Sequence, residues 1–221
     1  MESGLENRVV LVTGASGGIG SSMVRAFLAE DSKVAVHYGN QRDSAEKLAT
    51  ESEGRAKAFQ ADLTQEAEVE RLFGDIESEL GPVECVIANA GIWPAENVPI
   101  HEMTLTQWNK TVAVDLTSVF LTMRRFFIGI RNFELKDPSA VLIGSTAAVF
   151  GEAGHVDYAA AKAGISYGML QTLKNEISQL TRSGRVNAVC PGWVMTPMAE
   201  KFAEDRESKA RALQTLSLIH I

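Results

Sequence analysis

The chain has 221 residues, a hydrophobic content of 45%, a charged content of 22% and a formal net charge of -7. Its length suits one α/β domain with a sizeable core, and its composition is ordinary for a soluble globular protein. The negative charge gives no attraction to nucleic acid or anionic membranes, and no apolar run approaches the about 20 residues that span a bilayer. The N-terminal residues lack the apolar stretch of a signal peptide, so we expect a cytoplasmic protein.

Apolar, β-branched runs alternate with helical patterns along the chain, and short loops join them. The predicted strands are residues 8–13, 33–38, 56–60, 83–88, 141–143 and 185–190. The predicted helices are residues 18–30, 43–53, 65–80, 106–131 and 158–182, with further helical residues at 195–216. Strands that alternate with helices form a parallel sheet covered on both faces. We therefore predict a single doubly wound domain over residues 1–221, with ligand at the carboxyl ends of the strands near the switch point.

The first predicted strand ends in a glycine-rich turn, T-G-A-S-G-G-I-G, over residues 13–20. Glycine lets the backbone approach a pyrophosphate, whose charge the amides and dipole of a helix N-terminus favour. A tight strand-to-helix turn without a ligand would explain the same residues. The position of the turn, after the first strand of a repeating β/α chain, favours dinucleotide binding.

Two cysteines and four histidines are scattered along the chain. Cys85 and Cys190 lie in different strand-like segments, which is typical of buried thiols in a reducing compartment. The histidines show no metal-ligand spacing. The sequence therefore predicts no metal site.

The stretch from Val141 to Tyr167 carries the residues best suited to chemistry. Its apolar strand leads to Ser145, and a loop rich in small residues separates Ser145 from Tyr158. Tyr158 opens a helical pattern in which Lys162 follows four residues later, so the phenol and the ammonium share one helix face. At about 5 Å and an effective dielectric of about 20, the ammonium supplies roughly 3 kcal/mol toward lowering the tyrosine pKa. A surface Tyr and Lys on an ordinary helix are the alternative.

Five motifs, in this order, resemble the short-chain dehydrogenase/reductase family over roughly residues 5–200. They are the glycine-rich turn, Asn89-Ala90-Gly91, Ser145, the Tyr158 and Lys162 pair, and Pro191-Gly192. Within the family the chain most resembles 3-oxoacyl-acyl-carrier-protein reductase-like members. The resemblance implies a Rossmann-type fold and hydride transfer between a nicotinamide and a carbonyl or secondary alcohol.

The resemblance also implies roles for the matching residues. Tyr158 exchanges a proton with the substrate oxygen, Ser145 hydrogen-bonds that oxygen, and Lys162 lowers the tyrosine pKa and holds the nicotinamide ribose. Asp115 completes the predicted catalytic set. The predicted cofactor-binding residues are Gly14, Ser16, Gly18, Ile19, Gly20, Tyr38, Arg42, Asp62, Leu63, Asn89, Ala90, Gly91, Tyr158, Lys162, Pro191, Gly192, Val194 and Thr196.

Asp115 is the first departure from the family pattern, which usually has Asn at this place in the long helix. That Asn helps a water bridge to the lysine. An Asp still accepts a hydrogen bond but adds a negative charge, which could damp turnover or strengthen the hold on the lysine. A partly exposed helix acid is the alternative.

The second departure concerns the cofactor. NAD enzymes usually carry an acid at the end of the second strand for the ribose 2′-OH, and Tyr38 takes that position here. Arg42 could pair with a 2′-phosphate, although Gly17 stands where many NADP-dependent relatives have Arg. The sequence favours NADP over NAD. A solvated Arg42 is the alternative.

The third departure is the C-terminus, where relatives continue to a seventh strand that often contributes to a subunit interface. We expect six strands here, a truncated or unrelated tail and an exposed edge at the sixth strand. Residues 195–216 are expected to form substrate-side helices, and a homodimer or homotetramer is implied by the resemblance alone. Candidates for the substrate pocket are Trp93, Trp193 and His155 in its wall, and Met195, Met198 and Phe202 in an apolar lid, although ordinary packing explains each equally well.

The sequence as a whole favours an NAD(P)-dependent alcohol dehydrogenase or carbonyl reductase that acts on a small molecule. A non-catalytic dinucleotide-binding module is the main alternative; Asp115 and the absent seventh strand favour it, and the intact serine, tyrosine and lysine oppose it. A third interpretation keeps the cofactor for epimerisation or dehydration, which this fold also hosts. The substrate itself is not predicted.

Overall fold

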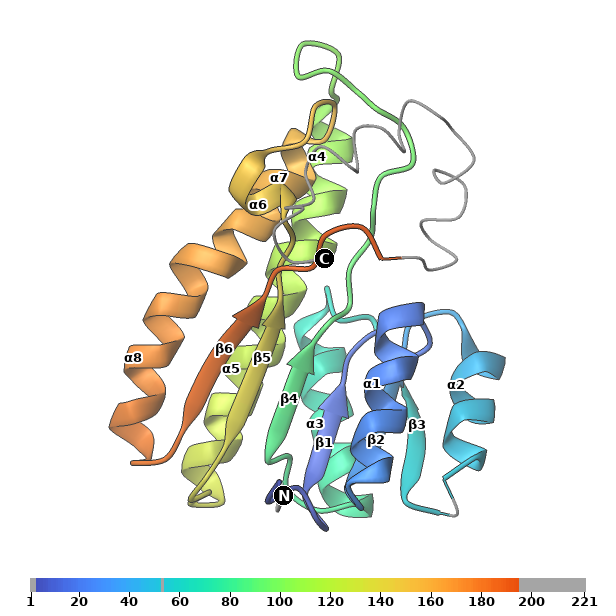
Figure 1. Ribbon diagram of the computed structural model, residues 1–221, viewed down its shortest axis with the longest axis vertical. Coiled ribbons are helices and arrows are strands. Elements are labelled where there is room, and N and C mark those ends of the chain that lie inside the picture. Colours follow the sequence, from blue (N-terminus) through green and yellow to red (C-terminus); the bar gives the residue numbers. More distant parts are fainter. Residues whose placement is uncertain (1–2, 53, 195–221) are drawn as a thin grey trace.

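A computed structural model of the chain describes residues 3–52 and 54–194. Six parallel strands form one sheet in the order β3-β2-β1-β4-β5-β6 (Figure 1). The strands are β1 (Val9–Val12), β2 (Lys33–Tyr38), β3 (Ala56–Gln60), β4 (Cys85–Ala88), β5 (Ser139–Ile143) and β6 (Arg185–Val189). This order confirms the predicted doubly wound sheet, with its switch point between β1 and β4.

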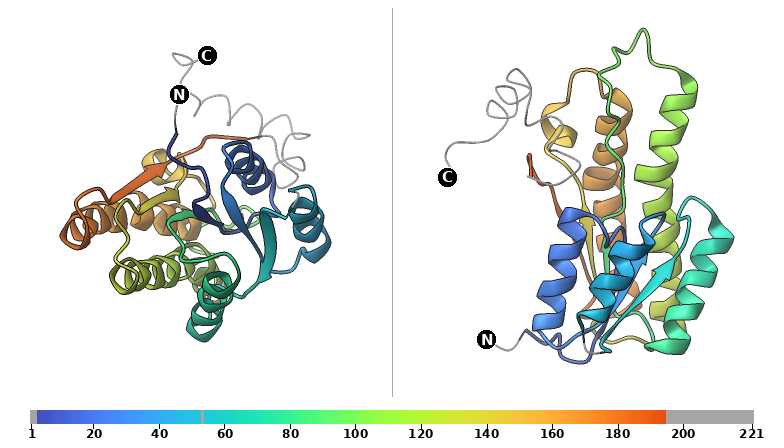
Figure 2. Two further views of the ribbon diagram at one scale, coloured as in Figure 1. Left: turned by 90° about the horizontal axis from the view of Figure 1, so that it is seen from below. Right: turned by 90° about the vertical axis from the view of Figure 1, so that its right-hand side faces the viewer.

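Ten helical segments connect and cover these strands within the described residues. They are α1 (Gly18–Ala29), α2 (Arg42–Thr50), α3 (Glu66–Glu79), α4 (Leu105–Val112), the π-helical η1 (Ala113–Thr117), α5 (Ser118–Asn132), α6 (Ala147–Phe150), α7 (Val156–Ala163), the π-helical η2 (Gly164–Met169) and α8 (Leu170–Leu180). Helices α1 and α2 lie on one face of the sheet, and α3, α5 and α8 lie on the other (Figure 2). None of the helices in the described ranges is long and apolar enough to cross a membrane.

The core has one half on each face of the sheet. Val10 and Val12 of β1 pack in the half under α1 and α2, whereas Val9 and Leu11 pack in the other half. Successive strand residues point to opposite faces, so a strand buried on both sides needs apolar residues at every position. This explains why β1 reads as an unbroken apolar run.

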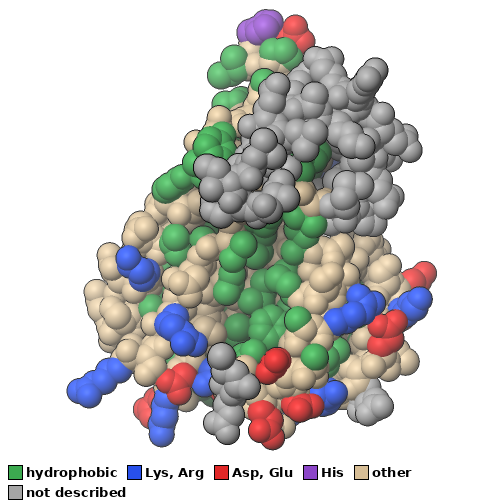
Figure 3. Space-filling model, in the orientation of Figure 1, with side chains coloured by type: hydrophobic (Ala, Val, Ile, Leu, Met, Phe, Trp, Pro, Cys, Tyr) green, Lys and Arg blue, Asp and Glu red, His purple; other side chains and the backbone are tan. Residues whose placement is uncertain are grey.

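Strand β6 has a single neighbour among the described residues, β5, which it meets in register from Arg185 opposite Ser139 to Val189 opposite Ile143. Val189 is 52% exposed. Apolar side chains gather in a hollow down the middle of the face drawn in Figure 3. The predicted helices at 195–216 and the predicted tail lie outside the described residues.

Three local predictions differ from the structure. The predicted helix 106–131 is divided by η1, the helix that carries Tyr158 is divided by η2, and the predicted loop after Ser145 contains the short helix α6. A π-helical turn holds an extra residue within a helix and rotates the side chains around it. Gly164 lets the two π-helical segments approach, because a Cβ atom there would lie 3.2 Å from the Leu116 side chain. This contact brings the segment that carries Asp115 toward the helix that carries Lys162.

Candidate active site

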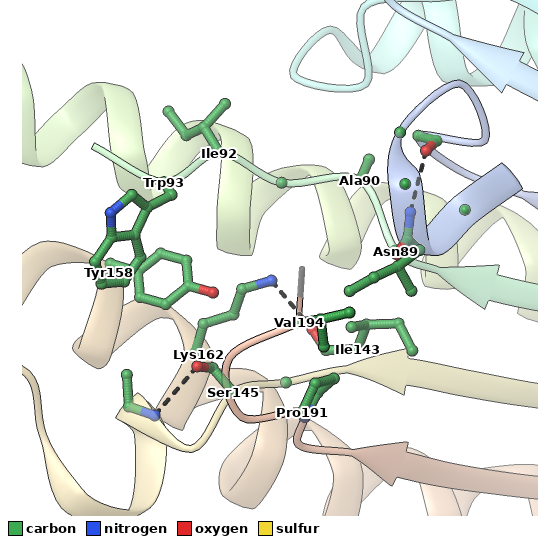
Figure 4. Close-up of a pocket in the computed structure, with 18 of the residues that line it drawn as sticks. Asn89, Ala90, Ile92, Trp93, Ile143, Ser145, Tyr158, Lys162, Pro191 and Val194 are labelled. Atoms are coloured by element: carbon green, nitrogen blue, oxygen red, sulfur yellow. Dashed lines mark hydrogen bonds between the residues drawn. The ribbon is translucent and has the colours of Figure 1, made fainter. Parts of the chain in front are cut away.

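A cavity of about 580 Å³ lies beyond the carboxyl ends of the central strands, at the predicted switch point (Figure 4). Its walls come from the segments that follow β1, β2, β4, β5 and β6. The predicted site residues that line it are Gly14, Ser16, Gly18, Ile19, Gly20, Asn89, Ala90, Gly91, Ser145, Tyr158, Lys162, Pro191, Gly192 and Val194. Residues far apart in the sequence therefore share one site.

Five predicted site residues do not line this cavity, and four of them belong to the predicted cofactor set. Tyr38 packs in the core under α2, and Leu63 packs in the core on the opposite face. Arg42 is exposed and forms an ion pair with Glu46 at 2.6 Å.

The carboxylate of Asp62 accepts hydrogen bonds from the backbone and the hydroxyl of Thr64, at 2.9 and 2.7 Å. The fifth residue, Asp115, lies behind the cavity wall. Four further residues of the sequence analysis, Met195, Thr196, Met198 and Phe202, lie outside the described residues.

The glycine-rich turn depends on glycines that pack directly against neighbouring backbone. Gly14 has a positive φ of 61°, and a Cβ atom there would lie 2.9 Å from Ala90 Cα. A Cβ atom on Gly20 would lie 2.8 Å from Ala15 Cα and closer still to the Gly14 carbonyl oxygen. The Asn89 amide donates to the Gly14 carbonyl at 3.1 Å and so ties this turn to the end of β4.

This turn fits the diphosphate of a dinucleotide. Helix α1 begins at Gly18 after Gly17, and no side chain caps its N-terminus. The first-turn residues of α1 line the cavity, where their backbone amides and the helix dipole favour an anion.

His37 is a site residue that the sequence analysis did not single out. Its Nε2 donates to the Ala61 carbonyl at 3.0 Å, so its Nδ1 is the acceptor for the Gly14 N–H, also at 3.0 Å. Burial lowers the pKa of His37 to about 4, and the hydrogen bond to Ala61 partly offsets this shift. A neutral, buried histidine therefore holds the glycine-rich turn. The sequence signal was weak, because it consists only of a histidine near the end of an apolar strand.

Ser145, Tyr158 and Lys162 converge at the end of β5. The Lys162 ammonium lies 5.7 Å from the centre of the Tyr158 ring and donates to the Ile143 carbonyl at 3.1 Å. The Ser145 oxygen accepts a hydrogen bond from Ala147 N at 3.1 Å. In Figure 4 the Tyr158 hydroxyl and the Lys162 amine point into the same space. Lys162 is only 4% exposed, so the alternative of a surface lysine is wrong.

The tyrosine pKa differs from the sequence expectation. Burial raises the pKa of Tyr158 to about 12; hydrogen bonding with Ser145 lowers it, and the charge of Asp115 raises it further. Desolvation disfavours the phenolate more than the serine favours it. The net shift is therefore opposite to the lowering that was predicted from Lys162.

Asp115 is fully buried in η1, so the alternative of a partly exposed helix acid is wrong. Its Oδ1 accepts a hydrogen bond from Ile92 N at 2.7 Å, and its Oδ2 has no hydrogen-bond partner among the described residues. Burial raises the pKa of Asp115 to about 6, whereas the nearby Lys162 charge lowers it. Burial lowers the pKa of Lys162, which Asp115 in turn raises.

Aromatic side chains form the end of the cavity away from Asn89. The Trp93 ring lies 4.8 Å from the Tyr158 ring and 5.9 Å from the Trp193 ring, centre to centre, in both cases edge to face. Behind Trp93, the fully buried His155 ring lies 4.0 Å away and does not line the cavity. The two tryptophans therefore fit the predicted pocket wall, and His155 supports it from behind.

Several lining residues were missed because nothing distinguishes them in sequence. They are Gln41, Ile92, Ile143, Gly144, Thr146, Ala147 and Glu152. Each lies within a few residues of a strand end or of a predicted site residue, and that position was the available signal. Among the described residues, no group of three or more His, Cys, Asp or Glu side chains could hold a metal ion.

Comparison with known proteins agrees with this geometry. The family model described as short chain dehydrogenase matches residues 8–207. A curated relative, 3beta-hydroxysteroid dehydrogenase 1 from Eggerthella lenta, is 36% identical over 217 residues, which cover 95% of this chain and 79% of the relative.

Proposed function

The chain belongs to the short chain dehydrogenase family, and we propose that it interconverts a secondary alcohol and a ketone with Tyr158 as the proton donor and acceptor. Its family makes it an oxidoreductase that acts on a CH–OH group with NAD or NADP. The observation that carries the proposal is the convergence of Ser145, Tyr158 and Lys162 beside a turn that fits a dinucleotide.

In this proposal each residue has one task. The nicotinamide cofactor, when bound, supplies the hydride to the carbonyl carbon or takes it from the carbinol carbon. Ser145 donates a hydrogen bond that orients the substrate oxygen, and Tyr158 gives that oxygen its proton in reduction. Lys162 lies close enough to stabilise the phenolate that remains. Oxidation reverses these roles.

The raised tyrosine pKa favours the reductive direction near neutral pH. With a pKa of about 12, Tyr158 is protonated there and is ready to act as a general acid. Oxidation needs the phenolate, which is scarce until the pH is high. We therefore propose ketone reduction as the faster direction at neutral pH.

We propose NADP as the favoured cofactor. Gln41, an uncharged residue, lines the cavity beyond the end of β2, and no acidic residue among the described lining residues lies at that end. An acid there would be expected for an NAD enzyme. Arg42 is the next residue, and its exposed side chain forms an ion pair with Glu46.

We propose two candidate substrate classes. The sequence resemblance suggests a 3-oxoacyl thioester, and the name of the relative suggests a hydroxysteroid or its ketone. The test is a steady-state assay of NADPH oxidation with ketones of both classes. Tyr158→Phe is expected to lower kcat by about 100- to 10,000-fold. Tyr167→Phe is the matched control, because Tyr167 is 51% exposed on η2 and does not line the cavity.

The same assay separates this proposal from a non-catalytic dinucleotide-binding module. Cofactor binding without turnover of any ketone would favour the module. Turnover that Tyr158→Phe leaves intact would instead contradict the role of the tyrosine.

A homodimer or homotetramer is also proposed. Phe120, on α5, is 51% exposed and lines a cavity of about 370 Å³ with Met123, Leu173 and Leu180 of α5 and α8. Exposed apolar patches of this kind are typical of subunit contacts. Light scattering of Phe120→Ser should show a smaller species than the wild type if this face is buried between subunits.

A further inference from the structure

The aromatic side chains around the catalytic residues form a continuous surface. Trp93 follows β4 and Trp193 follows β6, and these strands flank β5, whose end leads to Ser145. The two indoles line the same cavity as the reacting groups and touch each other. At 5.9 Å between ring centres they leave no space for a ligand between them. They form one wall rather than the two jaws of a clamp.

This wall is held in a fixed orientation. Trp93 packs against both Tyr158 and His155, with ring centres 4.8 and 4.0 Å away. His155 is fully buried, and burial lowers its pKa, which keeps the ring uncharged beneath the indole. A rigid wall contributes more to binding than a mobile one, because little side-chain freedom is lost when a ligand arrives.

We propose that Trp93 and Trp193, together with the Tyr158 ring, form an aromatic wall that binds the flat face of a ring-containing substrate whose reacting carbon belongs to the ring. This inference rests on the proposed alcohol and ketone chemistry. The Trp93 indole is in contact with the ring of the proton-donating tyrosine, so a substrate ring that contains the reacting carbon lies against the indole. In Figure 4 these two rings lie together at one end of the cavity.

The shape of the wall distinguishes rings from chains. A fused ring presents a flat apolar face that contacts an indole without losing internal rotations. A linear acyl chain must first be ordered along the wall, and each frozen rotation weakens its binding. The wall therefore favours a cyclic ketone over a linear 3-oxoacyl substrate with the same number of carbons.

The test compares decalone, a bicyclic ketone, with the linear methyl ketone that has the same number of carbon atoms, in the presence of NADPH. The wild type is expected to prefer decalone in kcat/KM by about tenfold or more. Trp93→Leu and Trp193→Leu should remove most of this preference by raising KM, and Trp93→Phe should retain part of it. Preference for the linear ketone, or a preference that survives in both leucine variants, would overturn the proposal.

A binding measurement keeps this result separate from the proposed reaction. Decalone is titrated into the enzyme with oxidised NADP, a pair that cannot react, while tryptophan fluorescence is recorded. Quenching should persist in Trp108→Phe, because Trp108 on α4 does not line the cavity, and should weaken in Trp93→Phe. Quenching without turnover of any ketone would refute the proposed reaction and leave the wall as a binding site. Turnover without quenching would refute the wall.

Discussion

Asp115 and Lys162 meet beside Gly91: a Cβ atom on that glycine would lie 2.7 Å from Asp115 Oδ1 and 3.3 Å from Lys162 Nζ. Both side chains are buried, and each favours the charged form of the other. A carboxylate at this position also raises the pKa of Tyr158. The charge states of these three residues are therefore linked.

Replacement of the carboxylate should shift the pH dependence of the enzyme. Asp115→Asn keeps an oxygen that can accept the Ile92 N–H but removes the charge that raises the pKa of Tyr158 and of Lys162. We expect the alkaline rise of alcohol oxidation to begin at a lower pH, with oxidation at neutral pH faster by about two- to tenfold. Profiles of kcat against pH that superimpose for the two proteins would show that Asp115 does not act through charge.

The wild type itself should oxidise alcohols better as the pH rises. Because burial raises the pKa of Tyr158 to about 12, the phenolate fraction should grow about tenfold per unit between about pH 7 and about pH 9. Reduction should stay nearly constant over that range. Ser145→Ala removes a hydrogen bond that lowers the pKa of Tyr158. Alcohol oxidation should therefore be slower in this variant than in the wild type at the same pH. The measurement is the initial rate in each direction against pH, and a flat oxidation profile would contradict the assignment.

The sequence predicts those parts of the site that are set by backbone motifs. The glycine-rich turn, Asn89 and the end of β5 reach the cavity because the carboxyl ends of parallel strands meet at one edge of the sheet. Lys162 reaches it because it lies one helical turn after Tyr158. Spacing alone is enough to bring these residues together.

The remaining residues depend on packing, which spacing does not reveal. Tyr38 occupies the predicted place at the end of β2, but its ring is buried under α2, and Gln41 lines the cavity instead. The π-helical segment η1 had no signal either, since it contains neither Pro nor Gly. The burial of Asp115 and the direction of the tyrosine pKa shift follow from that packing.

His37 should make the protein sensitive to acid. Its pKa is lowered from 6.5 to about 4, so the unfolded chain takes up a proton more readily than the folded chain between these values. Folding stability should therefore fall by about 3 kcal/mol as the pH drops from about 6.5 to about 4. Asp115, with its raised pKa, acts in the opposite direction over part of the same range.

A difference measurement isolates the histidine from Asp115. The free energy of unfolding in urea is measured at each pH for the wild type and for His37→Gln, whose amide can also accept one hydrogen bond and donate another. The difference in the free energy of unfolding between the wild type and His37→Gln should become smaller as the pH falls. His101→Gln, at an exposed histidine, is the matched control. A gap that does not change with pH would contradict the role of His37.

Gly20→Ala should weaken the binding of NADPH. A Cβ atom there would collide with Gly14 and Ala15 backbone, so the turn must shift. We expect the dissociation constant for NADPH to rise by about tenfold or more, as one or two hydrogen bonds to phosphate are lost. Gly168→Ala is the matched control, because a Cβ atom on Gly168 would have open space for 4 Å around it. Equal NADPH affinity in both variants would show that the turn does not hold the diphosphate.

Cofactor choice can be tested on one exposed ion pair. Arg42 now binds Glu46, four residues along α2, and such exposed pairs are weak enough for the arginine to turn toward a 2′-phosphate near Gln41. We expect kcat/KM to be about tenfold higher with NADPH than with NADH, and Arg42→Ala to lower the NADPH value alone. Glu46→Gln releases the arginine and should raise the NADPH value. Steady-state kinetics with both cofactors give the answer: a preference for NADH that neither substitution alters would assign NAD to this enzyme.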